Sequence, residues 1–188
     1  KENGRMKIAV CGRMRSGKDT FANRLVEEYG FKEFKFSKGI NEIINKYFPE
    51  HAFSEKKPRK HQQFIGQGMR QLDENVWIDY TLSYVEEYLA ENGDDADVVI
   101  SDLRQENEAR ILKDNGFTIV NVYAFDDIRL QRIIDAGDVF AEETFCHETE
   151  ISVDDIACDF WISNNDDIED FKVKTDNLIK LLKTVDEL

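Results

Sequence analysis

Residues Lys7 to Thr20 read KIAVCGRMRSGKDT, and this stretch decides the fold. A short apolar run, Ile8 to Cys11, stops at Gly12, and Gly17 and Lys18 follow at the spacing G-x-x-x-x-G-K. In a loop of this kind backbone N–H groups converge on phosphate oxygens, the lysine adds a positive charge, and the next helix adds the partial charge of its N-terminus. The stretch predicts a strand, a phosphate-binding loop and a helix. The alternative is a glycine turn that precedes a helix by chance.

The residue after Lys18 departs from the common pattern of such loops. Ser or Thr usually stands there and supplies a hydroxyl to Mg²⁺. This chain has Asp19 instead and places the hydroxyl one position later, in Thr20. Because a carboxylate is also a good ligand for Mg²⁺, both residues are candidate metal ligands.

Composition limits the kind of protein. The chain has 188 residues, 13 of them Phe, and 41% hydrophobic residues, which suits one globular domain with a single core. Its formal net charge of −14 argues against a nucleic-acid partner, since a phosphodiester backbone would be repelled. The three cysteines have no C-x-x-C spacing, which favours free thiols that serve packing in a reducing compartment. No apolar run approaches the ~20 residues that span a membrane, so we expect a cytoplasmic protein.

Apolar patterns along the chain predict strands that alternate with helices. Four strand patterns follow the first, at residues 31–37, 97–101, 117–124 and 160–163. Helical patterns extend from the loop to Gly30 and lie at residues 40–47, 59–92 with a break near Gly66 and Gly68, 105–115, 126–136 and after Asn164. Residues 49–58 contain two prolines and mixed charges, which predicts a loop. The alternation predicts a five-stranded parallel sheet flanked by helices.

The carboxyl ends of parallel strands form the edge where such proteins bind ligands. Asp102 follows the strand pattern at 97–101, and Arg104 lies two residues later, so an extended backbone directs both to one side. Beside a phosphate loop, Asp102 is suited to hold Mg²⁺ or to accept the proton of the attacking oxygen, and Arg104 to bind an acceptor phosphate. The alternative is structural: Asp102 caps a helix and Arg104 pairs only with Glu108.

Other polar residues are expected near the same edge. Arg129 and Arg132 share a face of a predicted helix and are suited to clamp the transferring phosphoryl group; the alternative is a solvated helix face. Arg59 and Arg70 flank the predicted helix break and are candidates for holding the phosphate of an acceptor. Asn164 follows the last strand, where its amide is suited to bind a nucleobase or to cap the next helix.

Two further residues are assigned structural roles. Trp77 is expected in the core. The segment His147 to Glu150 contains one histidine with no second histidine nearby, which favours a polar, non-catalytic role over a metal site.

The ordered motifs resemble those of one family. Gly12-x-x-x-Ser16-Gly17-Lys18-Asp19-Thr20 is similar to the loop of the phage-type deoxynucleoside monophosphate kinases, in which the aspartate after the lysine is usual. Gln63, Gly66 and Trp77 fall in a stretch that resembles the family's Q-x-x-G segment and its following tryptophan. Asp102-Leu103-Arg104 with residues 106–109 resembles its D-x-R segment, and His147-x-Thr149-Glu150 and Asp159-x-x-Ile162-x-Asn164 resemble its final two blocks.

This resemblance implies an α/β, three-layer P-loop kinase fold that forms a single domain over residues 1–188. It also implies an acceptor-binding helical segment at about 38–92 and a lid at about 126–155. The implied reaction is ATP-dependent phosphoryl transfer to a (deoxy)nucleoside monophosphate, with Mg²⁺ as cofactor. The expected partners are small-molecule nucleotides, without nucleic acid or membrane. We expect a monomer or homodimer, in the host cytoplasm if a phage encodes it.

The resemblance and the residue patterns together assign roles to individual side chains. The expected catalytic residues are Lys18, Asp102, Arg104, Arg129 and Arg132. The donor nucleotide is expected to contact Gly12, Arg15, Ser16, Gly17, Lys18, Asp19, Thr20 and Asn164. The acceptor is expected to contact Arg59, Gln63, Arg70 and Arg104, and the candidate metal ligands are Asp19, Thr20 and Asp102.

Two alternative functions stay open. Phosphomevalonate kinases have a similar S-G-K-D loop and D-x-R segment, so the chain is alternatively a kinase for a non-nucleotide phosphate. The second alternative is a regulatory module that binds a nucleotide without transferring its phosphoryl group.

Overall fold

The computed structural model describes residues 5–52, 59–93, 96–137 and 152–185, and of residues 51, 52, 59, 152 and 185 it describes the backbone alone. At its centre is a sheet of five parallel strands in the order β2-β3-β1-β4-β5. The strands are β1 (Lys7–Cys11), β2 (Lys32–Phe34), β3 (Val98–Leu103), β4 (Thr118–Tyr123) and β5 (Phe160–Ser163). Each predicted strand pattern overlaps one of these strands, so the predicted five-stranded sheet is confirmed.

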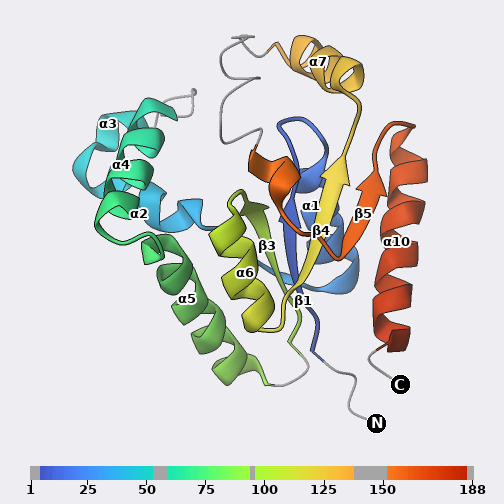
Figure 1. Cartoon of the computed structure of the whole chain (residues 1–188), viewed down its shortest axis with the longest axis horizontal. Helices are drawn as coiled ribbons and strands as arrows, with labels where there is room; N and C mark the ends of the chain where they lie inside the picture. The colour runs from blue at the N-terminus through green and yellow to red at the C-terminus, as the bar shows by residue number, and fades with distance from the viewer. Residues whose placement is uncertain (1–4, 53–58, 94–95, 138–151, 186–188) are drawn as a thin grey trace.

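Helices cover both faces of the sheet (Figure 1). On one face lie α1 (Lys18–Tyr29) and α10 (Ile168–Val185), whose core contains Val10 of β1 and Phe171. On the other lie α2 (Ser37–Tyr47), α5 (Val76–Asn92) and α6 (Glu106–Asp114), whose core contains Ala9 of β1 and Trp77. Neighbouring residues of β1 thus enter opposite cores, as strand geometry requires. The predicted three-layer α/β fold and the buried position of Trp77 are confirmed.

The helical segment expected at 59–92 differs from the prediction in one respect. Helix α4 (Arg59–Leu72) continues through Gly66 and Gly68, and the chain turns instead at residues 73–75, before α5. Gly66 serves close packing: a Cβ there would lie 3.1 Å from Cδ1 of Ile40. Its carbonyl oxygen accepts a hydrogen bond from Nε1 of Trp77 at 3.1 Å. The predicted break was wrong because this glycine lets α2, α4 and α5 approach one another.

The remaining elements surround the loop end of the sheet. The predicted loop at 49–58 begins with a short helix, α3 (Pro49–Ala52), and then leaves the described residues. Helix α7 (Asp126–Asp135) lies beyond the carboxyl end of β4 (Figure 1), and the 3-10 helix η1 (Ser152–Asp155) precedes β5. Residues 138–151 lie outside the described residues; they include 147–150 and nearly half of the predicted lid.

Two of the cysteines are described. Cys11 and Cys158 are free, buried thiols with their Sγ atoms 3.4 Å apart, which fits the expected packing role. Among the described helices, none has both the length and the apolar character that crossing a membrane requires.

Candidate functional site

The loop between β1 and α1 contains two glycines that leave no room for a side chain. A Cβ on Gly12 would lie 2.3 Å from the carbonyl oxygen of Val122, and one on Gly17 would lie 2.1 Å from Nδ2 of Asn164. Gly17 has a φ of +107° and Arg15 a φ of +62°, so the loop turns tightly before α1. This geometry fits the predicted phosphate loop.

Arginines from α7 bind the outside of this loop. Nε of Arg129 donates to the carbonyl oxygen of Met14 at 2.8 Å, and Nη1 of Arg132 donates to that of Arg15 at 3.2 Å. Arg129 is fully buried and forms an ion pair with Asp126 at 2.7 Å. Arg129 therefore does not lie on a solvent-exposed helix face, which was the alternative interpretation of this residue.

The position of these arginines differs from the predicted clamp. The sequence predicts that Arg129 and Arg132 close over the transferring phosphoryl group, whereas the structure places both against the loop backbone. Carbonyl oxygens of a loop have no partner within a helix or strand, and the two guanidiniums supply donors to them. Burial also lowers the pKa of Arg132 from its ordinary value.

Asn164, which follows β5, supports the third consecutive carbonyl of the loop. Its side-chain Nδ2 donates to the carbonyl oxygen of Ser16 at 2.8 Å. The backbone carbonyl oxygen of Asn164 accepts from Nη2 of Arg132, also at 2.8 Å. It does not cap α10, since Oδ1 of Asp167 accepts from the N–H of Asp170 at that helix start. Asn164 is 6% exposed, and its side chain supports the loop. The sequence analysis instead predicts that this side chain contacts a nucleobase.

The three supported carbonyls belong to residues 14–16. Because the C=O and N–H of one peptide group point to opposite sides, carbonyl oxygens of residues 14 and 16 held from outside favour N–H groups of residues 15 and 17 that point inward. The N–H of Ser16 donates within the loop, to the carbonyl oxygen of Arg13 at 3.1 Å. Oγ of Ser16 is buried and has no hydrogen-bond partner among the described residues. Together with the space that Gly12 and Gly17 keep open, this arrangement fits the phosphates of ATP.

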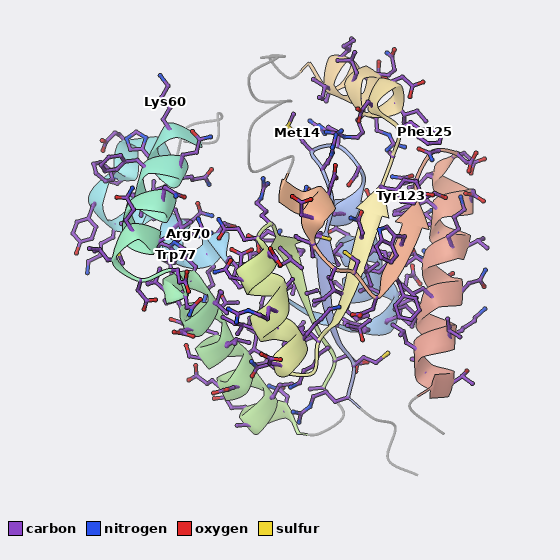
Figure 2. All side chains as sticks on the ribbon, in the orientation of Figure 1. Met14, Lys60, Arg70, Trp77, Tyr123 and Phe125 are labelled. Atoms are coloured by element: carbon purple, nitrogen blue, oxygen red, sulfur yellow. The ribbon has the colours of Figure 1, made fainter. Side chains whose placement is uncertain are left out.

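Arg13 of the loop is held by acidic residues of two elements. Its Nε lies 3.0 Å from Oδ1 of Asp154 in η1, and its Nη1 lies 3.7 Å from Oδ1 of Asp126 in α7. A cavity of about 560 Å³ adjoins these residues. Its other lining residues are Ser16, Asn121, Tyr123, Ala124, Phe125 and Trp161. Figure 2 shows Met14, Tyr123 and Phe125 at the end of the sheet near α7, with Arg70 on the side of the helices α2–α5.

Asp102 lies within β3, which extends two residues beyond the predicted strand. Its Oδ1 accepts from the N–H of Phe36 at 2.8 Å, and its Oδ2 accepts from the N–H of Ser37 at 2.9 Å. The carboxylate therefore anchors the start of α2, a helix distant in sequence, and does not cap the helix that follows β3. Each carboxylate oxygen has a second lone pair, so these contacts are compatible with a metal ligand.

Glu108 of α6 joins two of the predicted acceptor residues. Its Oε2 accepts from the N–H groups of Arg104 and Gln105 at 2.9 and 3.1 Å. Its Oε1 accepts from Nη2 of Arg70 in α4 at 3.1 Å. Burial raises the pKa of the Glu108 carboxyl, while the Arg104 amide and the Arg70 charge oppose this shift and Asp102 adds to it.

The other predicted residues are less closely grouped. Gln63 is exposed on α4, and the side chain of Arg59 lies outside the description. Asp19 and Thr20 are exposed in the first turn of α1. Among the described residues, no three His, Cys, Asp or Glu side chains lie close enough together to hold a metal ion. Mg²⁺ needs only one or two carboxylates where phosphates supply further ligands, so Asp19, Thr20 and Asp102 stay candidate ligands.

The sequence analysis missed several contacts. Glu108 carried a recognisable signal, since Gln105-x-x-Glu108 is a capping-box pattern, and the structure contains both capping hydrogen bonds. The ion pair of Arg13 with Asp154 and the aromatic cavity have no such signal, because their residues are distant in sequence.

Comparison with known proteins agrees with the geometry. A family model described as an AAA domain matches residues 8–145, well over half of the chain. None of the curated proteins compared with the sequence matches it.

Several solved kinases share the fold at low sequence identity. A dephospho-CoA kinase from Campylobacter jejuni is 19% identical with a TM-score of 0.56, and the match covers 95% of this chain and 97% of that one. A shikimate kinase from Acinetobacter baumannii is 15% identical with a TM-score of 0.57, over 97% and 95% of the two chains. A gluconokinase from Sinorhizobium meliloti is 13% identical with a TM-score of 0.59, over 98% and 97%. The chain thus has the fold of P-loop kinases, and by its family match it belongs to the AAA domain family.

Proposed function

We propose that this protein transfers the γ-phosphoryl group of ATP to a (deoxy)nucleoside monophosphate and forms the diphosphate. The observation that carries the proposal is the phosphate loop, in which side chains from α7 and the end of β5 bind the carbonyl oxygens of residues 14–16. A loop held in this way presents its N–H groups to the phosphates of the donor without reorganisation during the reaction.

The donor side has distinct roles for the loop residues. The loop N–H groups and the charge of Lys18 hold the β- and γ-phosphates, while Arg129, Arg132 and Asn164 preserve the loop conformation. Asp19 or Thr20, with Asp102, would hold Mg²⁺, which neutralises charge on the phosphates. Little covalent chemistry is required of the protein, because positioning and charge neutralisation supply most of the acceleration.

The acceptor side favours a substrate that already carries a phosphate. Arg70 donates through its guanidinium, and Arg104 through its backbone N–H, to the carboxylate of Glu108, so the two residues lie close together. A guanidinium is well suited to bind phosphate through paired hydrogen bonds. Helices between residues 38 and 92 form the acceptor-binding segment in this proposal, and residues 126–155 form the lid. The family resemblance of the D-x-R segment supports a nucleotide as acceptor.

A panel of phosphorylated acceptors tests the proposal. Purified protein with ATP and Mg²⁺ is expected to form ADP in the presence of at least one common (deoxy)nucleoside monophosphate. Turnover of phosphomevalonate, with none of any nucleotide, would assign the chain to the alternative kinase reaction. Shikimate and gluconate are informative negative controls, because they lack the phosphate that Arg70 and Arg104 are proposed to bind.

The Arg104→Ala variant separates transfer from simple nucleotide binding. We expect it to lower acceptor-dependent ADP formation by about 10- to 100-fold, the loss of one charge-assisted contact. Arg110→Ala, at an exposed arginine on the helix α6 that follows Arg104, is the matched control and should retain activity. If Arg104→Ala forms ADP at the wild-type rate, Arg104 does not bind the acceptor. If the wild-type protein forms ADP no faster with any acceptor than without one, the regulatory-module alternative is favoured.

The metal assignment has its own test. We expect Asp19→Ala to weaken Mg²⁺-dependent activity more than it weakens ATP binding measured without metal. Equal losses in the two measurements would show that the carboxylate stabilises the first turn of α1 and does not bind the metal.

A further inference from the structure

Glu108 is a buried charge that the proposed reaction does not yet use. It lies in the first turn of α6 and is 2% exposed. A carboxylate in such a place requires several donors, because burial removes it from water. It has three: two backbone N–H groups at the start of α6 and the guanidinium of Arg70.

These contacts join two elements that are distant in sequence. Oε2 fixes the turn between β3 and α6 through the N–H of Arg104, and Oε1 fixes Arg70 at the end of α4. The Arg70 side chain is 20% exposed, so part of it stays accessible. Nη2 of Arg70 lies 3.1 Å from the carboxylate, which restricts the orientation of a long and flexible side chain.

We propose that Glu108 is a positioning residue that orients Arg70 and the Arg104 turn toward one phosphate of the acceptor. The inference rests on the proposed function, since it needs an acceptor that carries a phosphate. Glu108 does not itself touch the acceptor. Its effect reaches the substrate through the arginines, in the way that a buried partner orients a residue that binds the substrate.

Steady-state kinetics of Glu108→Gln test the inference. The glutamine retains an oxygen that can accept from the backbone N–H groups and loses the charge that holds Arg70. We expect the KM of the acceptor to rise about tenfold, with kcat and the KM of ATP changed less than about twofold. Glu106→Gln is the matched control, because Glu106 lies exposed in the same helical turn. It should leave all three parameters unchanged.

A double-mutant cycle distinguishes positioning from general stabilisation. If Glu108 acts through Arg70, adding Glu108→Gln to Arg70→Ala should raise the acceptor KM no further than Arg70→Ala alone. Independent, multiplicative effects would overturn the inference. A Glu108→Gln variant that melts at a lower temperature but keeps the wild-type acceptor KM would also overturn it, since that is the result of a purely structural role.

The experiments also distinguish a folding defect, failure of the proposed function and failure of this inference alone. If Glu108→Gln fails to fold, Glu108→Asp keeps the charge and withdraws it by one methylene, and the same rise in acceptor KM is expected. If the wild-type protein phosphorylates only an acceptor without a phosphate, the proposed function fails and this inference fails with it. If the wild-type protein phosphorylates a nucleoside monophosphate and neither Glu108 variant alters its KM, the inference alone fails.

Discussion

The loop side and the helical side of the candidate site use charged side chains in opposite ways. On the loop side, Arg129 and Arg132 donate to backbone carbonyl oxygens at the start of α1. On the helical side, Asp102 and Glu108 accept from backbone N–H groups at the starts of α2 and α6. Cations thus shape the backbone on one side, and carboxylates shape it on the other.

Under the proposed function, this difference predicts how each side binds a phosphate. The residue before α1 is Gly17, which has no side chain to cap the first N–H groups, so an anion there meets the backbone. The first N–H groups of α2 and α6 are already bound by Asp102 and Glu108, so an anion on the helical side meets arginine side chains. Substitutions on the loop side should therefore affect the donor, and those on the helical side the acceptor.

The largest effect is expected for Lys18→Ala. Under the proposed function this charge contacts the donor phosphates, so removing it should lower phosphoryl transfer by about 10²- to 10³-fold. Lys38→Ala, in the first turn of α2, removes a lysine from the corresponding place on the helical side and serves as the control. ADP formation at saturating acceptor checks both variants. Equal losses would contradict the division between the two sides.

Gly17→Ala is expected to have the next largest effect, on stability. The new Cβ would meet Nδ2 of Asn164 at a φ of +107°, and the strain and overpacking should together cost about 3 kcal/mol of unfolding free energy. Gly30→Ala also lies at positive φ, but its Cβ would meet nothing within 4 Å. That control should cost about 1 kcal/mol, which isolates the contact with Asn164. Urea unfolding measures both; equal losses would show that the contact is unimportant.

Asp102→Asn should have a smaller effect on the helical side. The amide NH₂ would face one of the two backbone N–H groups at the start of α2, which should cost about 2 kcal/mol of unfolding free energy. Asp114→Asn, on the exposed end of α6, is the control and should be neutral. Measuring the Mg²⁺ concentration for half-maximal activity sharpens the result. A rise without loss of stability would favour the metal role over the anchoring role.

The smallest effect is a difference in pH dependence between two carboxylates. Asp176 lies far from the site, and the hydrogen bond from Arg24 lowers the pKa of its carboxyl. The contribution of Asp176 to stability is therefore present above about pH 4 and is lost as the pH falls through the lowered folded-state pKa. Burial raises the pKa of Glu108, so its contribution is greatest below about pH 4 and declines as the pH rises through the folded-state pKa.

The two variants should therefore show opposite trends. Asp176→Asn should become more destabilising from about pH 3 to about pH 7, and Glu108→Gln less destabilising over the same range. Urea unfolding at several pH values checks the two slopes. Parallel slopes would contradict the difference in environment between the two carboxylates.

The part of the site that could be predicted from the sequence is the part built from local pattern. The spacing of Gly12, Gly17 and Lys18 identified the loop, and the residue pattern at 97–101 placed Asp102 at the correct edge of the sheet. Gly66 shows the limit of such reasoning. A glycine in a helix is read locally as a break, although here it allows two neighbouring helices to approach.

By itself, the sequence determined the strand, loop and helix around Lys18, the alternation of strands and helices, and hence the parallel sheet. These features follow from side-chain periodicity and from glycine geometry, which act over a few residues. Only the tertiary structure decided that Arg129 supports the loop, that Asp102 anchors α2 and that Glu108 joins Arg70 to the turn at Arg104. These contacts satisfy buried backbone and charged groups, and the identity of each partner depends on which distant segments the fold brings together.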